Sequence, residues 1–190
     1  QKGSKWAEPK GISIPSLDLS GDFVNFYVSK SENIMLASFT GPDTKGLEDL
    51  YVIKREADKT WSQPLNLGDV INTSGFEISP YLSKNMDTLY FSSNGHEGYG
   101  DADIFYSIRQ DDTWTSWSVP VNLGKKINSP KFDAYLIFSE GNFYWSSNRA
   151  GDNSDLYYSR SVPPPPLTLA AQAILSFDPA KGHSIDLTPS

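Results

Sequence analysis

The sequence contains no cysteine, and only two of its 190 residues are histidine. Without cysteine the chain can form neither a disulfide framework nor a thiolate metal site. His96 and His183 are far apart in the sequence, and neither belongs to a paired-histidine metal motif or to a Ser/His/Asp arrangement. These absences count against a structural zinc site and against nucleophilic hydrolysis.

Positive charge is also scarce, with 16 lysine and arginine residues against 23 aspartate and glutamate residues and a formal net charge of -7. Nucleic acids and anionic lipid surfaces are bound through concentrations of Lys and Arg, so we expect neither as a partner. No run of residues is apolar and long enough for a membrane-spanning helix, so we expect no direct membrane span. Because the sequence starts at Gln1 rather than at Met, we expect a processed chain or a fragment.

The abundant residues are those of short strands and tight turns. Aromatic residues make up 13% of the chain, which also contains 14 Gly and 13 Pro. Tryptophan opens three similar phrases about 55 residues apart, Trp6-Ala-Glu-Pro9, Trp61-Ser-Gln-Pro64 and Trp117-Ser-Val-Pro120. The second and third phrases continue alike, as PLNLGDVINTS and PVNLGKKINSP. The chain from about Trp6 to Arg160 is therefore predicted to be three copies of one unit.

Each unit closes with an acid that precedes an aromatic strand, and these acids are Asp49, Asp103 and Asp155. In the second copy we expect four strands, near residues 65–70, 78–83, 88–93 and 103–108. Repeats of roughly this length with four strands each are typical of β-propeller blades. The predicted fold class is all-β, with propeller blades of four antiparallel strands at about 6–54, 61–108 and 117–160.

The phrases LYFSSNGHEGYGDADIFYS, FYWSSNRAGDNSDLYYSR and WSVPVNLGKKINSP resemble the WD-like, TolB-type propeller repeats of Bacteroidota envelope proteins. In that family the propeller often precedes a carboxypeptidase-regulatory-like domain and an OmpA-like peptidoglycan-binding domain, and some members act in type 9 secretion. The sequence departs from the family in two ways. Three blades are too few to close a ring, and the first copy has Ser38-Phe39-Thr40 where the others have Ser-Ser-Asn.

A change of composition marks a domain boundary after Arg160. Residues 161–166 include four consecutive prolines, which favour an extended linker. The 24 residues at 167–190 are too few for a complete sandwich domain. We interpret them as a tail, or as the truncated start of a regulatory-like β domain.

The loop between the two aromatic runs of LYFSSNGHEGYGDADIFYS is the first candidate site, together with its counterpart in the third copy. The candidate binding residues are His96, Glu97, Tyr99, Asp101, Arg149 and Asp152. If a metal is bound, we expect it to be calcium, with Asp101 and Asp103 as ligands, because calcium prefers carboxylate and carbonyl oxygens on flexible loops. The alternative is that Asp49, Asp103 and Asp155 are structural acids that accept backbone N–H bonds. We predict no cofactor.

The tryptophans could likewise be packing residues of the fold or exposed residues that contact a partner. Trp61 and Trp117 recur at the repeat spacing and are interpreted as packing residues. Trp114 and Tyr99 lie outside the repeated phrases, and we expect both to face solvent in turns.

The most regular acids recur once per unit, which is the behaviour of structural residues rather than of a catalytic pair. We therefore predict a non-enzymatic protein-binding or scaffolding module of a Gram-negative cell envelope, in the periplasm, associated with the outer membrane or at the cell surface. Other envelope proteins are the expected partners, and peptidoglycan would be bound only through a domain that this chain does not contain. The alternative is a glycan-binding or glycan-processing propeller.

Overall fold

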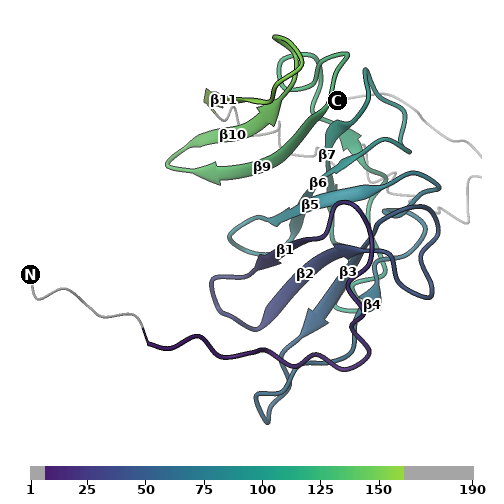
Figure 1. Cartoon of the computed structure of the whole chain (residues 1–190), viewed down its shortest axis with the longest axis vertical. Coiled ribbons are helices and arrows are strands. Elements are labelled where there is room, and N and C mark those ends of the chain that lie inside the picture. Colours follow the sequence, from purple (N-terminus) through teal and green to yellow (C-terminus); the bar gives the residue numbers. More distant parts are fainter. Residues whose placement is uncertain (1–6, 161–190) are drawn as a thin grey trace, which may run out of the picture. The chain divides into compact units, whose positions relative to one another are not determined.

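The regular elements of the described residues are all β-strands. The structure is a computed structural model that describes residues 7–160, with eleven strands in three antiparallel sheets and no helix in that range (Figure 1). The all-β prediction is confirmed, and the described residues contain no helix that could cross a membrane. The chain divides into two units after Arg160. The predicted linker at 161–166 and tail at 167–190 lie outside the described residues.

Each sheet is a simple meander of consecutive strands. The first sheet contains β1 (Asn25–Val28), β2 (Ile34–Phe39), β3 (Asp49–Lys54) and β4 (Leu65–Asn66). The second sheet contains β5 (Glu77–Leu82), β6 (Thr88–Ser93), β7 (Asp103–Ile108) and β8 (Val121–Asn122). The third sheet contains β9 (Asp133–Ser139), β10 (Asn142–Ser147) and β11 (Asp155–Arg160).

Two of the strands expected in the second copy, at 88–93 and 103–108, are present with those bounds. The strand expected at 65–70 is wrong in length and in partner. It is only Leu65–Asn66, and it pairs with β3 of the preceding sheet rather than with β5. The physical reason is Gly68, which has φ +88° and ends the strand in a turn whose Gly68 carbonyl accepts the N–H of Ile71 and Asn72. The first and second sheets therefore end with a strand, β4 or β8, that the sequence repeat assigns to the following copy.

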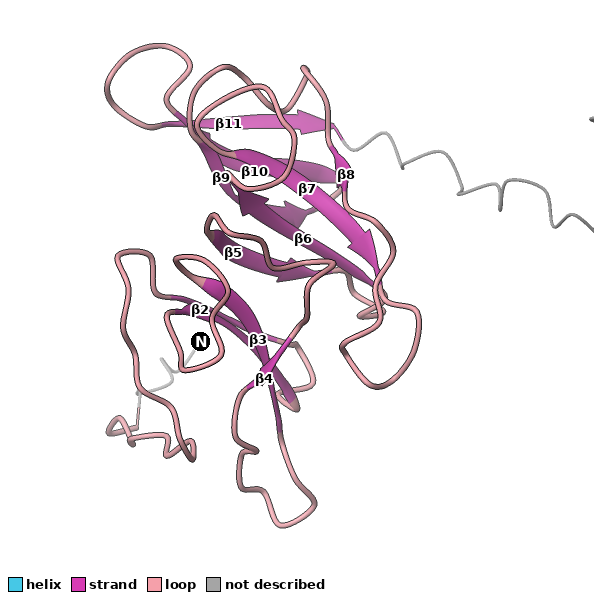
Figure 2. Ribbon diagram, turned by 90° about the vertical axis from the view of Figure 1, so that its right-hand side faces the viewer, coloured by secondary structure: helices cyan, strands magenta, loops and turns pink. Residues whose placement is uncertain are grey.

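The three sheets are stacked, with the second between the other two (Figure 1 and Figure 2). Between the first and second sheets lies a core that includes Leu36, Leu50, Leu89 and Phe105. Between the second and third sheets lies a core that includes Tyr90, Ile104, Leu136, Phe143 and Trp145. Because the second sheet is covered on both faces, its strands are mostly apolar on both faces and do not alternate.

The outer face of the first sheet is also covered. Met35, Phe39 and Tyr51 on this face pack against Ile14, Leu17, Val24 and Trp61. The N-terminal segment therefore closes this end of the stack.

An aromatic triangle joins the three sheets where their first strands begin. Phe76 and Phe132 immediately precede β5 and β9, and Phe23 lies two residues before β1. Their ring centroids are 5.5 Å (Phe23 to Phe76), 5.9 Å (Phe23 to Phe132) and 6.0 Å (Phe76 to Phe132) apart. The sequence repeat did not single out these residues, and their contact depends on the tertiary arrangement.

Candidate functional site

The repeated phrases PLNLGDVINTS and PVNLGKKINSP each contain an asparagine, Asn72 or Asn128, whose side chain forms two hydrogen bonds with the backbone of a strand residue. We call each such pair of hydrogen bonds a latch. The side-chain amide of Asn128 donates to the carbonyl of Ile104 and accepts its N–H, at 2.9 and 2.8 Å. Asn72 makes the same pair of bonds to Leu50. In both latches a second asparagine, Asn122 or Asn66, accepts a hydrogen bond from the amide at 2.8 Å. The strongest sequence motif is therefore a structural device.

Two of the repeated acids, Asp49 and Asp103, accept hydrogen bonds from backbone N–H groups, and Asp49 also accepts one from the side-chain amide of Asn66 at 2.8 Å. Asp103 Oδ2 accepts the N–H groups of Tyr99 and Gly100, and Asp49 Oδ2 accepts the N–H of Lys45 at 3.0 Å. Both side chains are buried, and their Oδ1 atoms accept no hydrogen bond in the described structure. Burial is the main reason that the pKa of each carboxyl is raised. The third acid, Asp155, is exposed and so does not share this environment.

One glycine of the candidate loop, Gly100, is explained by close backbone contacts. A Cβ atom on Gly100 would lie within 3.0 Å of the backbone of Ser129 and Pro130, just before β9. Gly46, one repeat earlier, stands in the same relation to Ser74 and Gly75 before β5. Each loop thus braces one sheet against the next, and only glycine permits this approach.

His96 is partly buried and packs against neighbouring residues. Its Nε2 lies 2.8 Å from the carbonyl oxygen of Ile71, within hydrogen-bonding distance. Its ring contacts Phe91 and Phe105, with centroids 5.8 and 5.3 Å away. Through these contacts His96 packs the loop between β6 and β7 against Ile71 and the second sheet.

The other candidate residues on this loop point to solvent. Glu97 and Asp101 are exposed, and Tyr99 is 43% exposed with Lys125 Nζ 5.6 Å from its ring centroid. The expectation that Tyr99 faces solvent is confirmed. These three side chains form the accessible tip of the loop between β6 and β7.

Arg149 and Asp152, the candidates in the third copy, are placed differently from each other. Arg149 forms an ion pair with the buried Asp133 at 2.8 Å and lies over the rings of Trp145 and Tyr157, at 5.4 and 4.7 Å. Its guanidinium group also donates to the Ile127 carbonyl. Asp152 is exposed at the loop tip.

Glu77 is a buried acid that was not among the predicted site residues. Glu77 is fully buried and accepts hydrogen bonds from Thr73 N, Thr73 Oγ1 and Ser93 Oγ at 2.6 to 2.7 Å. Burial raises the pKa of its carboxyl, and these hydrogen bonds and His96 act in the opposite direction. Asp133 accepts equivalent bonds from Ser129 in the next repeat. The recurring Thr/Ser four residues before Glu/Asp is the signal that would have identified the pair.

The carboxylates do not assemble a metal centre within residues 7–160, where no group of three or more His, Asp or Glu side chains comes together. Calcium requires six to eight oxygen ligands. Asp103 is already committed to backbone N–H groups through Oδ2, and Asp101 is exposed. Asp101 and Asp103 therefore do not form a calcium site in the described residues.

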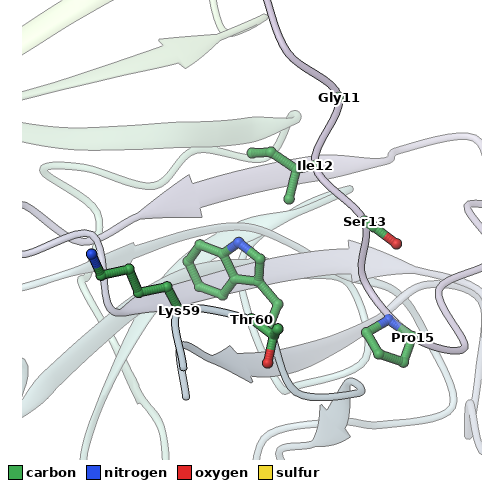
Figure 3. Close-up of a pocket in the computed structure, with 7 residues that line it drawn as sticks. Gly11, Ile12, Ser13, Pro15, Lys59 and Thr60 are labelled. Carbon is green, nitrogen blue, oxygen red and sulfur yellow. The ribbon is translucent and has the colours of Figure 1, made fainter. Parts of the chain in front are cut away.

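A pocket beside Trp61 was also not predicted. It is lined by residues of the N-terminal segment and of the loop after β3, namely Gly11, Ile12, Ser13, Pro15, Lys59, Thr60 and Trp61 (Figure 3). The guanidinium carbon of Arg55 lies 5.7 Å from the indole centroid. Trp61, which was predicted to be a packing residue, packs on the first sheet and is partly buried.

The expected exposure of Trp114 is wrong. Trp114 is 5% exposed and packs on Trp117, with ring centroids 6.0 Å apart, while Arg109 covers its ring at 4.8 Å. The Trp117 Nε1–H donates to the Trp114 carbonyl at 2.8 Å, so the two indoles form one buried unit in the core between the first two sheets.

The chain matches no protein-family model, and it matches no curated protein.

Proposed function

We propose that residues 7–160 are part of a β-propeller that binds another protein or scaffolds an assembly, without catalysing a reaction. The observation that carries this proposal is that the repeated polar residues have structural roles, whereas three polar residues at the tip of the loop between β6 and β7 are exposed. The repeated asparagines and two of the three repeated acids form hydrogen bonds with backbone groups, and the repeated Gly46 and Gly100 lie close to the backbone before the next sheet. The non-repeated Glu97, Tyr99 and Asp101 are left exposed at a loop tip, where a rigid scaffold holds variable residues for recognition.

The propeller architecture is supported by the equivalence of the three sheets. They stack in sequence order around the Phe23, Phe76 and Phe132 triangle, and the first two have four strands each. Propellers repeat four-stranded sheets around a centre. The resemblance of the repeat phrases to TolB-type propellers supports a place in a Gram-negative envelope, associated with the outer membrane. A link to type 9 secretion, or to peptidoglycan through an OmpA-like domain outside this chain, follows from that resemblance alone.

The binding proposal is tested with variants of the loop tip. The intact chain, a Glu97→Ala/Tyr99→Ala/Asp101→Ala variant and a Lys84→Ala/Glu140→Ala control would each be cross-linked in envelope extracts of a Bacteroidota species. The control residues are exposed in the hairpin turns at the other ends of β6 and β10. We expect the wild type and the control to recover the same envelope protein and the loop variant to lose it. Equal recovery by all three chains, or no recovery by any, contradicts the proposal.

A second candidate function, glycan binding, is favoured by the pocket beside Trp61. An indole next to the hydroxyls of Ser13 and Thr60 and the amine of Lys59 offers the stacking surface and polar groups that sugars use. Binding of the chain to a glycan array, with loss of the signal in Trp61→Ala and retention in Tyr99→Ala, would support it. An array without signal at millimolar glycan removes it.

A further inference from the structure

The third sheet has no fourth strand among residues 7–160. β4 pairs with β3 in the first sheet and β8 pairs with β7 in the second, whereas β11 pairs only with β10 and forms an edge (Figure 2). The middle of this edge strand, Leu156-Tyr157-Tyr158-Ser159, contains no charge and no proline. Charges and prolines commonly prevent further pairing of an edge strand, so the β11 edge is suited to accept another strand.

Leu156 has the same place in β11 as Leu50 in β3 and Ile104 in β7. Each is paired with a serine of the preceding strand, namely Ser146, Ser38 and Ser92. The backbone N–H and C=O of Leu50 and Ile104 face the outer edge of their sheets, where the latch asparagines bond to them. By the same register, the N–H and C=O of Leu156 face the outer edge of β11. No residue in the described range bonds to them there.

One short phrase fills this edge in the first and second sheets. In the first sheet Asn66 pairs with Tyr51, and the N–H of Leu67 donates to the Leu50 carbonyl at 3.0 Å. Asn122-Leu123 makes the same contacts in the second sheet. The phrase therefore supplies both the fourth strand and the latch.

The phrase also holds its own shape. The Gly68 carbonyl accepts the N–H groups of Ile71 and Asn72, and Asn66 Oδ1 accepts the N–H of Gly68 and the side-chain amide of Asn72. The second phrase repeats these bonds. Because the turn is organised by bonds within the phrase, a short segment loses less conformational freedom when it binds.

Apolar residues of the phrase cover the residue beside the latch. Leu67 and Ile71 belong to the same core as Leu50, and Leu123 and Ile127 pack with Ile104. Leu50 and Ile104 are fully buried as a result, whereas Leu156 is 77% exposed. Leu156 thus lacks the backbone partner and the apolar cover that its two equivalents have.

We propose that the β11 edge binds a segment of the sequence type Leu/Val-Asn-Leu-Gly-x-x-Ile-Asn, which adds the fourth strand to the third sheet. The first asparagine of the segment pairs with Tyr157, and the second forms a latch with the N–H and C=O of Leu156. The leucine and isoleucine of the segment cover the Leu156 side chain. Main-chain bonds give the affinity and the latch gives the specificity, as in other cases of strand addition.

The 190 residues do not themselves supply this segment. Asn-Leu-Gly occurs only at 66–68 and 122–124, and these two phrases are already paired with β3 and β7. Residues 161–190 contain no asparagine and so offer no latch residue. The occupant is therefore a further copy of the repeat, outside these 190 residues. The β11 edge contains none of the loop-tip residues, so this binding is independent of the function proposed for them.

The test is the binding of the chain's own phrase, as the peptide WSVPVNLGKKINSP, to the intact isotope-labelled chain by NMR. We expect saturable shifts of the amide signals of Leu156, Tyr157 and Tyr158, with a Kd below about 1 mM. The matched control is the same peptide with Asn128→Ala. It cannot form the latch and should bind at least about tenfold more weakly.

A covalent version covers the case of a weakly binding peptide. The phrase is joined to Ser190 through a flexible Gly/Ser linker, which gives an effective concentration on the order of millimolar. Hydrogen exchange of the Leu156 and Tyr158 amides should then be at least about tenfold slower than in a fusion whose added phrase carries Asn128→Ala.

Variants of the chain test the edge itself. Leu156→Pro removes the N–H that faces the edge and leaves the bonds between β10 and β11 in place. Leu156→Asp keeps the N–H and removes the apolar contact. Each should weaken peptide binding at least about tenfold. Val119→Asp changes a side chain that is 79% exposed and lies outside the third sheet, and this variant should bind like the wild type. Circular dichroism verifies that each variant is folded.

Four results would each overturn the proposal. Neither the peptide nor the fusion engages β11, or the Asn128→Ala phrase binds as well as the original. The two folded Leu156 variants bind the peptide like the wild type. Alternatively, the shifts are confined to β7 and β8, which means that the peptide only replaces the strand already present there.

Discussion

At the residue scale, single amide side chains replace missing backbone partners. Asn128 satisfies both the N–H and the C=O of Ile104, and Asn72 does the same for Leu50. These backbone groups are buried, so they have no access to water when the amide is removed.

We expect Asn128→Ala to reduce the free energy of unfolding by about 2–4 kcal/mol, because two buried backbone groups lose their partners. Urea denaturation measures this change. Asn153→Ala, at an exposed loop position, is the control and should change stability by less than about 0.5 kcal/mol. A similar small change in Asn128→Ala would show that the latch is dispensable.

The buried acids predict an unusual dependence of stability on pH. The pKa of Glu77 is raised from its ordinary 4.5, and those of Asp49 and Asp103 from 3.8, each chiefly by burial. A carboxyl with a raised folded-state pKa favours folding most below its unfolded pKa, and this contribution is lost as pH rises through the folded pKa. Stability should therefore increase as pH falls from neutral through the raised pKa of these carboxyls toward their ordinary values of 4.5 and 3.8.

Thermal unfolding across this range tests the sign. Glu77→Gln has no proton to bind and should show a shallower increase than the wild type. The lowered pKa values of Asp58 and Asp111, which accept hydrogen bonds from Thr60 and Thr113, act in the opposite direction only in stronger acid, near and below 3.8. A melting temperature that falls steadily from neutral to mildly acidic pH would refute the prediction.

At the scale of elements, the loop between β6 and β7 braces the entry to β9. Gly100→Ala should destabilise the protein by about 1–3 kcal/mol, because the added Cβ meets backbone that cannot rotate away. Gly151→Ala is a matched control, since no atom lies within 4 Å of its added Cβ. Differential scanning calorimetry compares the two. If both variants melt alike, the brace contributes nothing measurable.

At the scale of the whole molecule, the aromatic triangle couples all three sheets. Phe76 is 7% exposed and contacts both other rings. Phe76→Ala should lower stability by about 3–5 kcal/mol. Phe26→Ala, at a side chain that is 46% exposed, should have a much smaller effect.

Native-state hydrogen exchange would show whether the triangle acts as one unit. In Phe76→Ala we expect faster exchange in β1, β5 and β9 together. Faster exchange confined to β5 would mean that the sheets are stabilised separately.

The sequence by itself determined the all-β class, the three-fold repeat and the strands at 88–93 and 103–108, because these depend on local pattern and on turn residues. It also favoured a structural role for the recurring Asp49 and Asp103, although the third repeated acid, Asp155, is exposed. In the candidate loop, the sequence also showed that His96, Glu97 and Tyr99 are not repeated in the other copies.

Only the tertiary structure decided which strands share a sheet, because the turn at Gly68 sends Leu65–Asn66 to β3 rather than to β5. It also placed Trp114 in the core and His96 against the Ile71 carbonyl, and it brought Phe23, Phe76 and Phe132 together. The reason is physical: burial is a property of the neighbours that a side chain meets after folding. Leu50 and Ile104 are therefore buried in the first two sheets, whereas the equivalent Leu156 is exposed in the third.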